Sequence, residues 1–230
     1  MEYINVALDG PAGAGKSSIA KSLAEELGYI YIDTGAMYRS IAVYAIESGI
    51  DIKNQRNLLI NSLDNINVDI KYKDGTQHIF LNGNDVSERI READATKGSS
   101  DVAVIPEVRL KLVALQRSLA AGANVIMDGR DIATHVLPDA QVKIYLTASV
   151  EERAARRLRQ MRERGTDGDI KSVEEDIRLR DKQDSEREFA PLRRAEDAVL
   201  LDTSDMNFEE SVAAVKKIIL EKTGELDHVL

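Results

Sequence analysis

The residues best suited to chemistry lie in a glycine-rich segment close to the N-terminus. Gly10-Pro-Ala-Gly-Ala-Gly-Lys-Ser17 matches the pattern G-x-x-x-x-G-K-[ST] at every fixed position. Its glycines let the backbone turn sharply and aim successive N–H groups at a phosphate. We expect Lys16 to bridge the β- and γ-phosphates of a nucleoside triphosphate, and the Ser17 hydroxyl to ligate Mg²⁺.

A phosphate loop of this kind serves kinases, GTPase switches and motor ATPases alike, so other residues must separate them. The guanine-reading motif Asn-Lys-x-Asp does not occur in the sequence. Asp181-Lys-Gln-Asp184 looks similar, but it begins with aspartate and lies within a predicted helix. We interpret this segment as unrelated to guanine binding.

Two further polar segments follow apolar runs. Asp33-Thr-Gly-Ala-Met-Tyr-Arg39 is the first, in which Thr34 could cap the next helix and Arg39, one turn later, could reach a phosphate. Asp128-Gly-Arg-Asp131 is the second. There Arg130 can grip a phosphate and Asp131 can accept a hydrogen bond from an amino group.

Arginine is concentrated in the last third of the chain. Of 18 arginines, 11 lie between Arg153 and Arg194, against two lysines in the same stretch. Arginine grips phosphate with a planar fork, whereas lysine acts as a point charge. Because the stretch is also rich in acids, composition alone favours a solvated helix with salt bridges over a phosphate-binding cluster.

One helix in this stretch favours a functional role. The predicted helix from about Ile170 to Arg187 carries Ile170, Val173 and Ile177 on one face, and the same stripe continues as Arg180, Asp184 and Arg187. A buried stripe that changes from aliphatic to charged indicates a helix that leaves the core and enters a polar cleft.

Five short apolar runs are predicted to form the sheet that positions these residues. They are Ile4–Leu8, Tyr29–Ile32, Val125–Met127, Val142–Leu146 and Val199–Leu201, and an aspartate directly follows all but the fourth. Runs this apolar are typical of parallel strands buried on both faces, and helical stretches separate most of them. Polar residues at the carboxyl ends of such strands face the crevice where α/β proteins bind ligands.

Residues 63–89 depart from this α/β pattern. The alternating run Ile66–Tyr72 precedes a predicted turn at Lys73–Gly75, and the apolar run Ile79–Leu81 precedes Asn82-Gly83, a strong hairpin signal. These features predict a small antiparallel sheet inserted in the α/β body.

The sequence also predicts two helices. One carries Ile19, Leu23 and Leu27 on one face and ends at Gly28 as its cap, and the other starts near Pro106.

Length and charge restrict the classes of protein that fit. With 230 residues, a single α/β domain with small insertions is the simplest expectation. The net charge of −9 argues against nonspecific nucleic-acid binding, and the chain contains no cysteine for disulfides or thiolate metal sites. The sequence shows no signal peptide and no membrane-spanning run. We expect a cytoplasmic monomer without nucleic-acid or membrane partners.

These motifs in combination resemble the bacterial cytidylate kinases. The resemblance rests on the phosphate loop, Asp33–Arg39, Ser99-Ser-Asp-Val-Ala-Val-Ile-Pro-Glu-Val-Arg109, Asp128–Asp131, Val136-Leu-Pro-Asp139 and Arg180-x-x-x-Asp184-x-x-Arg187. It covers nearly the whole chain. Two departures, Leu137 where the family often has phenylalanine and Thr34 where it often has serine, keep the apolar and hydroxyl character of their positions.

The resemblance implies a fold and an activity. The fold would be a P-loop NTPase-type α/β domain over 1–230, with a five-stranded parallel sheet flanked by helices. It would include the antiparallel β insertion at 63–89, as a monophosphate-binding region, and a helical lid at 151–188 that carries Arg153, Arg156, Arg157 and Arg162. The activity would be transfer of the γ-phosphoryl group from ATP, with Mg²⁺, to CMP and also dCMP.

The resemblance also implies roles for individual residues. Lys16, Arg39, Arg130 and Arg187 would be catalytic, and the last three would hold the acceptor phosphate. Ser100, Arg109 and Asp131 would read the cytosine edge, Arg180 and Asp184 would hold the ribose, and Thr34 would also touch the acceptor. The donor would be bound by Gly10, Pro11, Ala12, Gly13, Ala14, Gly15, Lys16, Ser17, Ser18 and Arg157, with Ser17 on the metal.

Two other hypotheses remain open on the sequence. One is a P-loop kinase for a different small molecule, such as another monophosphate or a sugar acid. The other is a non-enzymatic P-loop switch or an ATP-dependent partner-binding module. ADP production across a panel of monophosphates separates all three.

Overall fold

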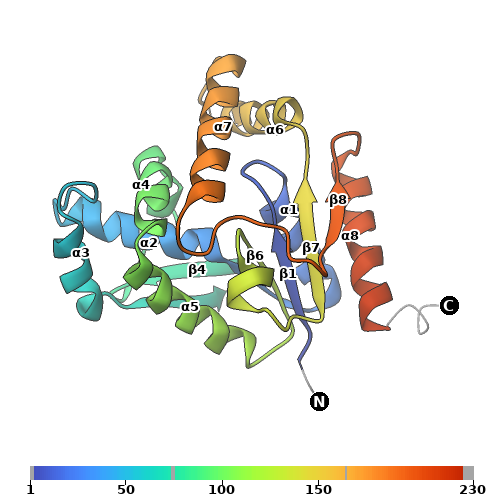
Figure 1. Cartoon of the computed structure of the whole chain (residues 1–230), viewed down its shortest axis with the longest axis horizontal. Coiled ribbons are helices and arrows are strands. Elements are labelled where there is room, and N and C mark those ends of the chain that lie inside the picture. The colour runs from blue at the N-terminus through green and yellow to red at the C-terminus, as the bar shows by residue number, and fades with distance from the viewer. Residues whose placement is uncertain (1–2, 74–75, 164, 225–230) are drawn as a thin grey trace. The chain divides into compact units, whose positions relative to one another are not determined.

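The computed structural model describes residues 3–73, 76–163 and 165–224, which form two compact units. The first unit comprises Met1–Tyr31 and Ala120–Leu230, and the second comprises Ile32–Leu119 (Figure 1). Among the described residues, none of the helices combines the length and the apolarity that a bilayer crossing requires. That 1–230 form a single kinase domain stays a prediction.

A five-stranded parallel sheet confirms the five predicted strands. Its order is β2-β6-β1-β7-β8, and the strands are β1 (Asn5–Asp9), β2 (Ile30–Asp33), β6 (Val125–Gly129), β7 (Val142–Thr147) and β8 (Val199–Asp202). β1 pairs in parallel with β6 on one side and β7 on the other, and β7 pairs with β8. All five residues of β6 are buried, as expected for a strand covered on both faces.

Two helices cover one face of this sheet and close its core. They are α1 (Lys16–Leu27) and α8 (Phe208–Thr223). Ile19 and Leu23 of α1 pack with Val215 and Ile219 of α8 and with apolar residues of β1, β6 and β7. Gly28 ends α1 in the left-handed conformation with φ 68°, which confirms the predicted cap.

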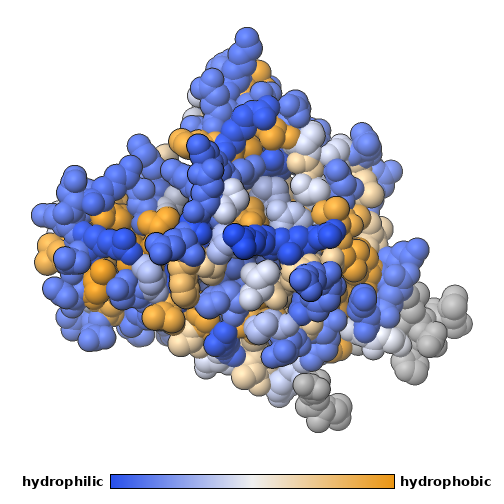
Figure 2. Space-filling view, viewed as in Figure 1, coloured by the Kyte–Doolittle hydropathy of each residue, from blue (hydrophilic) through white to orange (hydrophobic). Residues whose placement is uncertain are grey.

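The helical pair expected as a lid also belongs to the first unit. It consists of α6 (Val150–Glu163) and α7 (Ile170–Glu186), which pack through Ala154, Val173 and Ile177. The surface over these helices is mostly hydrophilic (Figure 2). Arg187 lies just beyond α7 in an extended conformation, so the helix ends one residue earlier than predicted.

The second unit combines helices with the predicted antiparallel sheet. Its helices are α2 (Thr34–Glu47), α3 (Arg56–Ser62), α4 (Ala93–Ala103) and α5 (Pro106–Ala120, whose last residue falls in the first unit), with single 3₁₀ turns at Leu63–Asn65 and Arg89–Arg91. Its sheet, β3 (Val68–Lys73), β4 (Thr76–Leu81) and β5 (Asn84–Asp85), is antiparallel. Asn82 and Gly83 both have positive φ, which confirms that hairpin turn. The predicted turn at Lys73–Gly75 falls largely outside the described residues.

Candidate active site

The glycine-rich segment connects β1 to α1, as its pattern requires. Gly10 has φ 152°, and a Cβ at this position would lie 1.9 Å from the backbone oxygen of Leu146. Gly15 has φ 92° and precedes the first residue of α1, so the backbone N–H groups of the loop lie at the N-terminal, positive end of this helix. This arrangement is a cradle for a phosphate anion.

Lys16 is folded back on the loop that carries it. Its Nζ donates hydrogen bonds to the carbonyl oxygens of Gly10 (2.7 Å) and Pro11 (2.8 Å), and the side chain is buried. Burial lowers the pKa of Lys16 well below its usual value, and the positive charge of Arg130 lowers it further, while nearby aspartates act in the opposite direction. A bound anion would stabilise the charged form of a lysine that is disfavoured in this way.

Ser17 contacts a carboxylate to which the sequence analysis gave no role. Its Oγ donates to Oδ2 of Asp128 at 2.6 Å, and the Tyr31 hydroxyl donates to Oδ1 of the same carboxylate at 3.1 Å. Asp128 lies on β6, whose register places it beside Leu8 of β1. Hydroxyl and carboxylate oxygens are ligands that suit Mg²⁺. The sequence signal that could have indicated this role is the position of Asp128 directly after the apolar run Val125–Met127.

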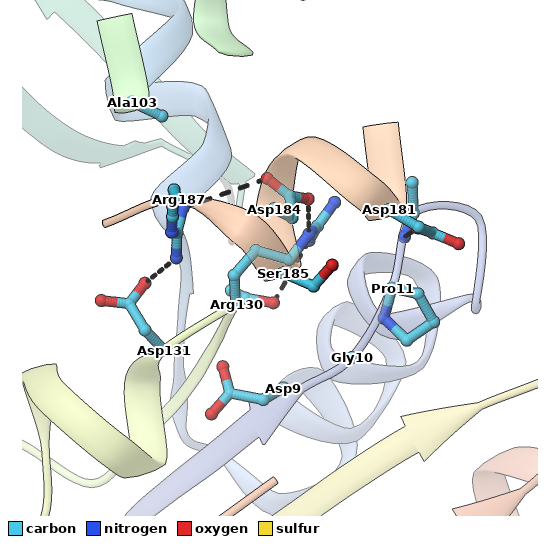
Figure 3. Close-up of polar contacts among 12 residues, drawn as sticks. Asp9, Gly10, Pro11, Ala103, Arg130, Asp131, Asp181, Asp184, Ser185 and Arg187 are labelled. Atoms are coloured by element: carbon cyan, nitrogen blue, oxygen red, sulfur yellow. Dashed lines mark hydrogen bonds and ion pairs between the residues drawn. The ribbon is translucent and has the colours of Figure 1, made fainter. Parts of the chain in front are cut away.

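The predicted acceptor residues of the first unit gather around two ion pairs (Figure 3). Nε of Arg130 lies 2.7 Å from Oδ2 of Asp184, and Nη2 of Arg187 lies 3.1 Å from Oδ1 of Asp131. Nη1 of Arg187 also lies 3.9 Å from Asp184, so the two pairs are joined. Each guanidinium is thus held in place by a carboxylate, although the motifs lie far apart in the chain.

The charges of this cluster shift one another's pKa values. Burial raises the pKa of Asp184, but Arg130, Arg180 and Arg187 lower it more, and the net pKa lies below its usual value. Burial likewise lowers the pKa of Arg130, and Asp184 and Asp128 more than offset this effect. The arginines therefore stay charged, ready to bind an anionic group.

Helices α6 and α7 contact the phosphate loop through Arg153 and Asp181, for which the sequence predicted no precise role. Nη1 of Arg153 donates to the Ala12 carbonyl at 2.9 Å and pairs with Asp181 Oδ2 at 2.6 Å. Oδ1 of Asp181 accepts the Ala12 N–H at 3.2 Å. Asp181, which we set aside as part of a guanine-like segment, is thus a direct partner of the loop.

A second arginine of α6 contacts the segment that follows β8. Arg156 donates to the Thr203 carbonyl at 2.7 Å, and more weakly to the Ala14 carbonyl of the phosphate loop at 3.4 Å. Arg157, expected to bind the donor, is exposed on α6, and its role stays a prediction.

The second unit holds four of the predicted acceptor residues. Arg39 pairs with Asp33 at 2.8 Å. Arg109 is fully buried, donates to the Ala103 carbonyl at 3.2 Å and lies over the Tyr38 ring, 5.4 Å from its centre. Ser100 lies on α4. Thr34 is buried, but Asp33 and not Thr34 caps α2, because the Asp33 carboxylate accepts the Ala36 N–H at 2.8 Å.

The first unit thus brings most of the predicted residues into one site. The gathered residues are the loop from Gly10 to Ser18, Arg130, Asp131, Arg180, Asp184 and Arg187. Such a site can cradle one phosphate chain on backbone N–H groups and hold a second anion with guanidinium forks. Thr34, Arg39, Ser100 and Arg109 belong to the other unit.

One comparison with solved structures supports the fold. A structure of an uncharacterized protein from Eubacterium ventriosum covers 94% of this chain and 98% of its own, with a TM-score of 0.53 and 12% identity. At an identity this low, the comparison shows a similar fold and nothing about function.

Comparisons of sequence reach further. Proteins named cytidylate kinase match this chain from Caldicellulosiruptor bescii (48% identity, covering 95% of this chain and 96% of the relative) and from Bacillus cereus strain B4264 (49%, covering 94% and 96%). The relative from Lactobacillus johnsonii, of the same name, is 48% identical and covers 95% of each chain. The family model described as cytidylate kinase matches residues 6–221. With the loop and the arginine–aspartate cluster in place, this chain belongs to the cytidylate kinase family.

Proposed function

We propose that this protein transfers the γ-phosphoryl group of ATP to CMP, giving ADP and CDP, and that it accepts dCMP as well. The observation that carries the proposal is that the phosphate loop at the start of α1 and the ion pairs Arg130–Asp184 and Arg187–Asp131 belong to one compact unit. The loop and the guanidinium groups offer sites for two anionic reactants. Membership of the cytidylate kinase family supports the choice of reaction.

The donor is held by the loop. Backbone N–H groups from Gly13 to Ser17 cradle its phosphates, and Lys16 exchanges the carbonyls of Gly10 and Pro11 for phosphate oxygens. Ser17 and Asp128 would hold Mg²⁺, directly or through water, because their oxygens already lie together. When bound, Mg²⁺ neutralises charge on the β- and γ-phosphates.

The acceptor is held by the ion-paired cluster. Arg130 and Arg187 bind the phosphate of CMP, and Asp184 with Arg180 binds the ribose hydroxyls. Each guanidinium keeps one carboxylate partner, so it is already oriented when the substrate arrives. The roles of Thr34, Arg39, Ser100 and Arg109 in holding the acceptor are part of the same proposal.

The chemistry requires little from the protein beyond position and charge. Phosphoryl transfer needs two anionic reactants held in line and charge on the equatorial oxygens neutralised. Lys16, Arg130 and Arg187 supply positive charge, and because Lys16 and Arg187 are buried, their electrostatic interactions with an anion are strong. No covalent phosphoenzyme is part of the proposal.

Base choice follows from Asp131. Its carboxylate accepts a hydrogen bond from the amino group of cytosine, whereas uracil would present a carbonyl oxygen to it. Two acceptors that face each other in a buried site cost about 1–3 kcal/mol. The kcat/KM for CMP should therefore exceed that for UMP by at least about tenfold.

A coupled assay of ADP production across nucleoside monophosphates, shikimate and gluconate tests this proposal. CMP and dCMP should be turned over best, and ADP production with ATP alone should be slow. Equal turnover of UMP and CMP would contradict the role of Asp131, and fast hydrolysis of ATP without an acceptor would contradict the kinase assignment. We also propose that the protein acts in the cytoplasm and is a monomer, and size-exclusion chromatography tests the oligomeric state.

A further inference from the structure

Asp9 is a buried carboxylate that neither the phosphate-loop motif nor the acceptor residues account for. It is the last residue of β1 and directly precedes Gly10, and it is only 1% exposed. A carboxylate so deeply buried is unfavourable unless its oxygens are well paired. Its contacts therefore indicate what it does.

Both oxygens of Asp9 bind one short segment of backbone. Oδ1 accepts the N–H of Ile132 at 2.9 Å, and Oδ2 accepts the N–H of Ala133 at 2.8 Å. In Figure 3 the carboxylate points from the end of β1 toward the helical turn that follows Asp131. Only a carboxylate offers an acceptor to each of two neighbouring N–H groups, because asparagine would turn its amide donor toward one of them.

The bound segment is the one that aims the acceptor residues. Ile132 begins a helical turn, Ile132–Val136, immediately after Arg130 and Asp131. The Asp131 carbonyl accepts the N–H groups of His135 (2.9 Å) and Val136 (3.1 Å), so this turn starts from Asp131 itself. Fixing the N–H groups of Ile132 and Ala133 thus fixes the peptide plane that follows Asp131 and the direction of its side chain.

The electrostatics agree with a positioning role. The pKa of Asp9 is raised to about 6, mainly by burial and also by the nearby charge of Asp131, while its hydrogen bonds to Ala133 and Ile132 act in the opposite direction. Two buried carboxylates close together are unfavourable. A side chain that only closed a turn would not need this charge next to Asp131.

We propose that Asp9 is a positioning residue for acceptor selection: it holds the turn after Asp131 and thereby aims the Asp131 carboxylate at the base. This inference rests on the proposed role of Asp131 in reading cytosine. The Asp9 carboxylate would thus connect the strand that leads into the donor loop with the turn that follows Asp131.

The test is the ratio of kcat/KM for CMP to that for UMP in Asp9→Asn. The ratio cancels any effect on ATP or on Lys16, because both acceptors share the same donor site. We expect the ratio to fall about tenfold, since one of two hydrogen bonds to the turn is replaced by an opposed donor. A wild-type ratio in the folded variant would overturn the inference.

A double-mutant cycle separates positioning from general damage. In an Asp131→Ala background, Asp9→Asn should change the ratio by less than about twofold, because the group it positions is gone. An equal fall in both backgrounds would contradict the inference. Val215→Ala, which opens a buried core position on α8, is the control for lost stability and should leave the ratio unchanged.

A measurement on the unmodified protein covers the case in which Asp9→Asn does not fold. Hydrogen exchange of the Ile132 and Ala133 amides in the nucleotide-free protein should be as slow as that of amides in β6. Fast exchange at both amides would overturn the inference, since the carboxylate would then not hold them. Failure of the proposed function would show earlier and separately, as a wild-type enzyme that does not prefer CMP.

Discussion

Replacing Arg153 with alanine tests how α6 and α7 are held against the phosphate loop. The Arg153 side chain is 6% exposed, and its guanidinium donates to the Ala148 carbonyl (2.9 Å), the Ala12 carbonyl (2.9 Å) and the Asp181 carboxylate (2.6 Å). The substitution Arg153→Ala removes all three contacts.

The magnitude follows from these contacts. Three hydrogen bonds at a net value of about 1 kcal/mol each give about 3 kcal/mol. Breaking a buried ion pair costs about 3–5 kcal/mol when the remaining charge stays buried. Because the Asp181 side chain is 23% exposed, water can reach its carboxylate. We therefore expect Arg153→Ala to lower the free energy of unfolding by about 3 kcal/mol, the lower end of that range.

Arg162→Ala is a matched control on the same helix. Arg162 pairs with Asp167 at 3.3 Å, but the two side chains are 62% and 80% exposed, and such pairs contribute less than about 1 kcal/mol. Urea unfolding followed by circular dichroism, with equal m-values, measures both losses. Losses within about 0.5 kcal/mol of each other would refute the view that Arg153 is a structural anchor.

Three other predictions concern single contacts. Burial raises the pKa of Asp9 from 3.8 to about 6, so the stability it contributes is complete below about pH 4 and is lost as the pH rises through 6. Asp9→Asn carries no charge at this position, so its free energy of unfolding relative to that of the wild type should rise by roughly 3 kcal/mol between about pH 4 and pH 7.5. Urea unfolding measures this difference, and a difference that does not change with pH would contradict the prediction. A Cβ at Gly10 would collide with backbone, so Gly10→Ala should abolish ATP binding in calorimetry. Gly49→Ala, with φ 68° and open space, should keep binding at a stability cost of about 1 kcal/mol. Because the Tyr38 ring lies 5.4 Å from the Arg109 guanidinium, Tyr38→Leu should raise the KM for CMP about three- to tenfold, whereas Tyr38→Phe should leave it unchanged.

Local patterns were enough to predict the sheet and the donor loop. The strands are short apolar runs with polar ends, and the loop is a contiguous motif, so neighbouring residues carry the signal. Along α7, one helix face passes from apolar packing at Ile177 to an ion pair at Asp184, which is also buried. That this part of the helix enters a polar cleft stays a prediction.

Contacts over long separations could not be predicted in this way. Asp9 reaches Ile132 across 123 residues, Ser17 reaches Asp128 across 111, and Asp181 reaches Ala12 across 169. No periodicity or motif spacing encodes such pairs. The cap of α2 was missed for another reason: Asp33 and Thr34 are adjacent and both suit an N-cap, so preference alone does not choose between them.

In the proposed reaction, the phosphoryl group passes directly from the donor held at the loop to an acceptor held by the arginine–aspartate cluster. Incubation of the wild-type enzyme with Mg²⁺, CMP and ATP labelled in the γ-phosphate follows that group. The label should appear in CDP in a one-to-one ratio with ADP, and Arg130→Met should reduce this transfer by at least about a hundredfold. Label recovered mainly as inorganic phosphate or bound to the protein would contradict the claim.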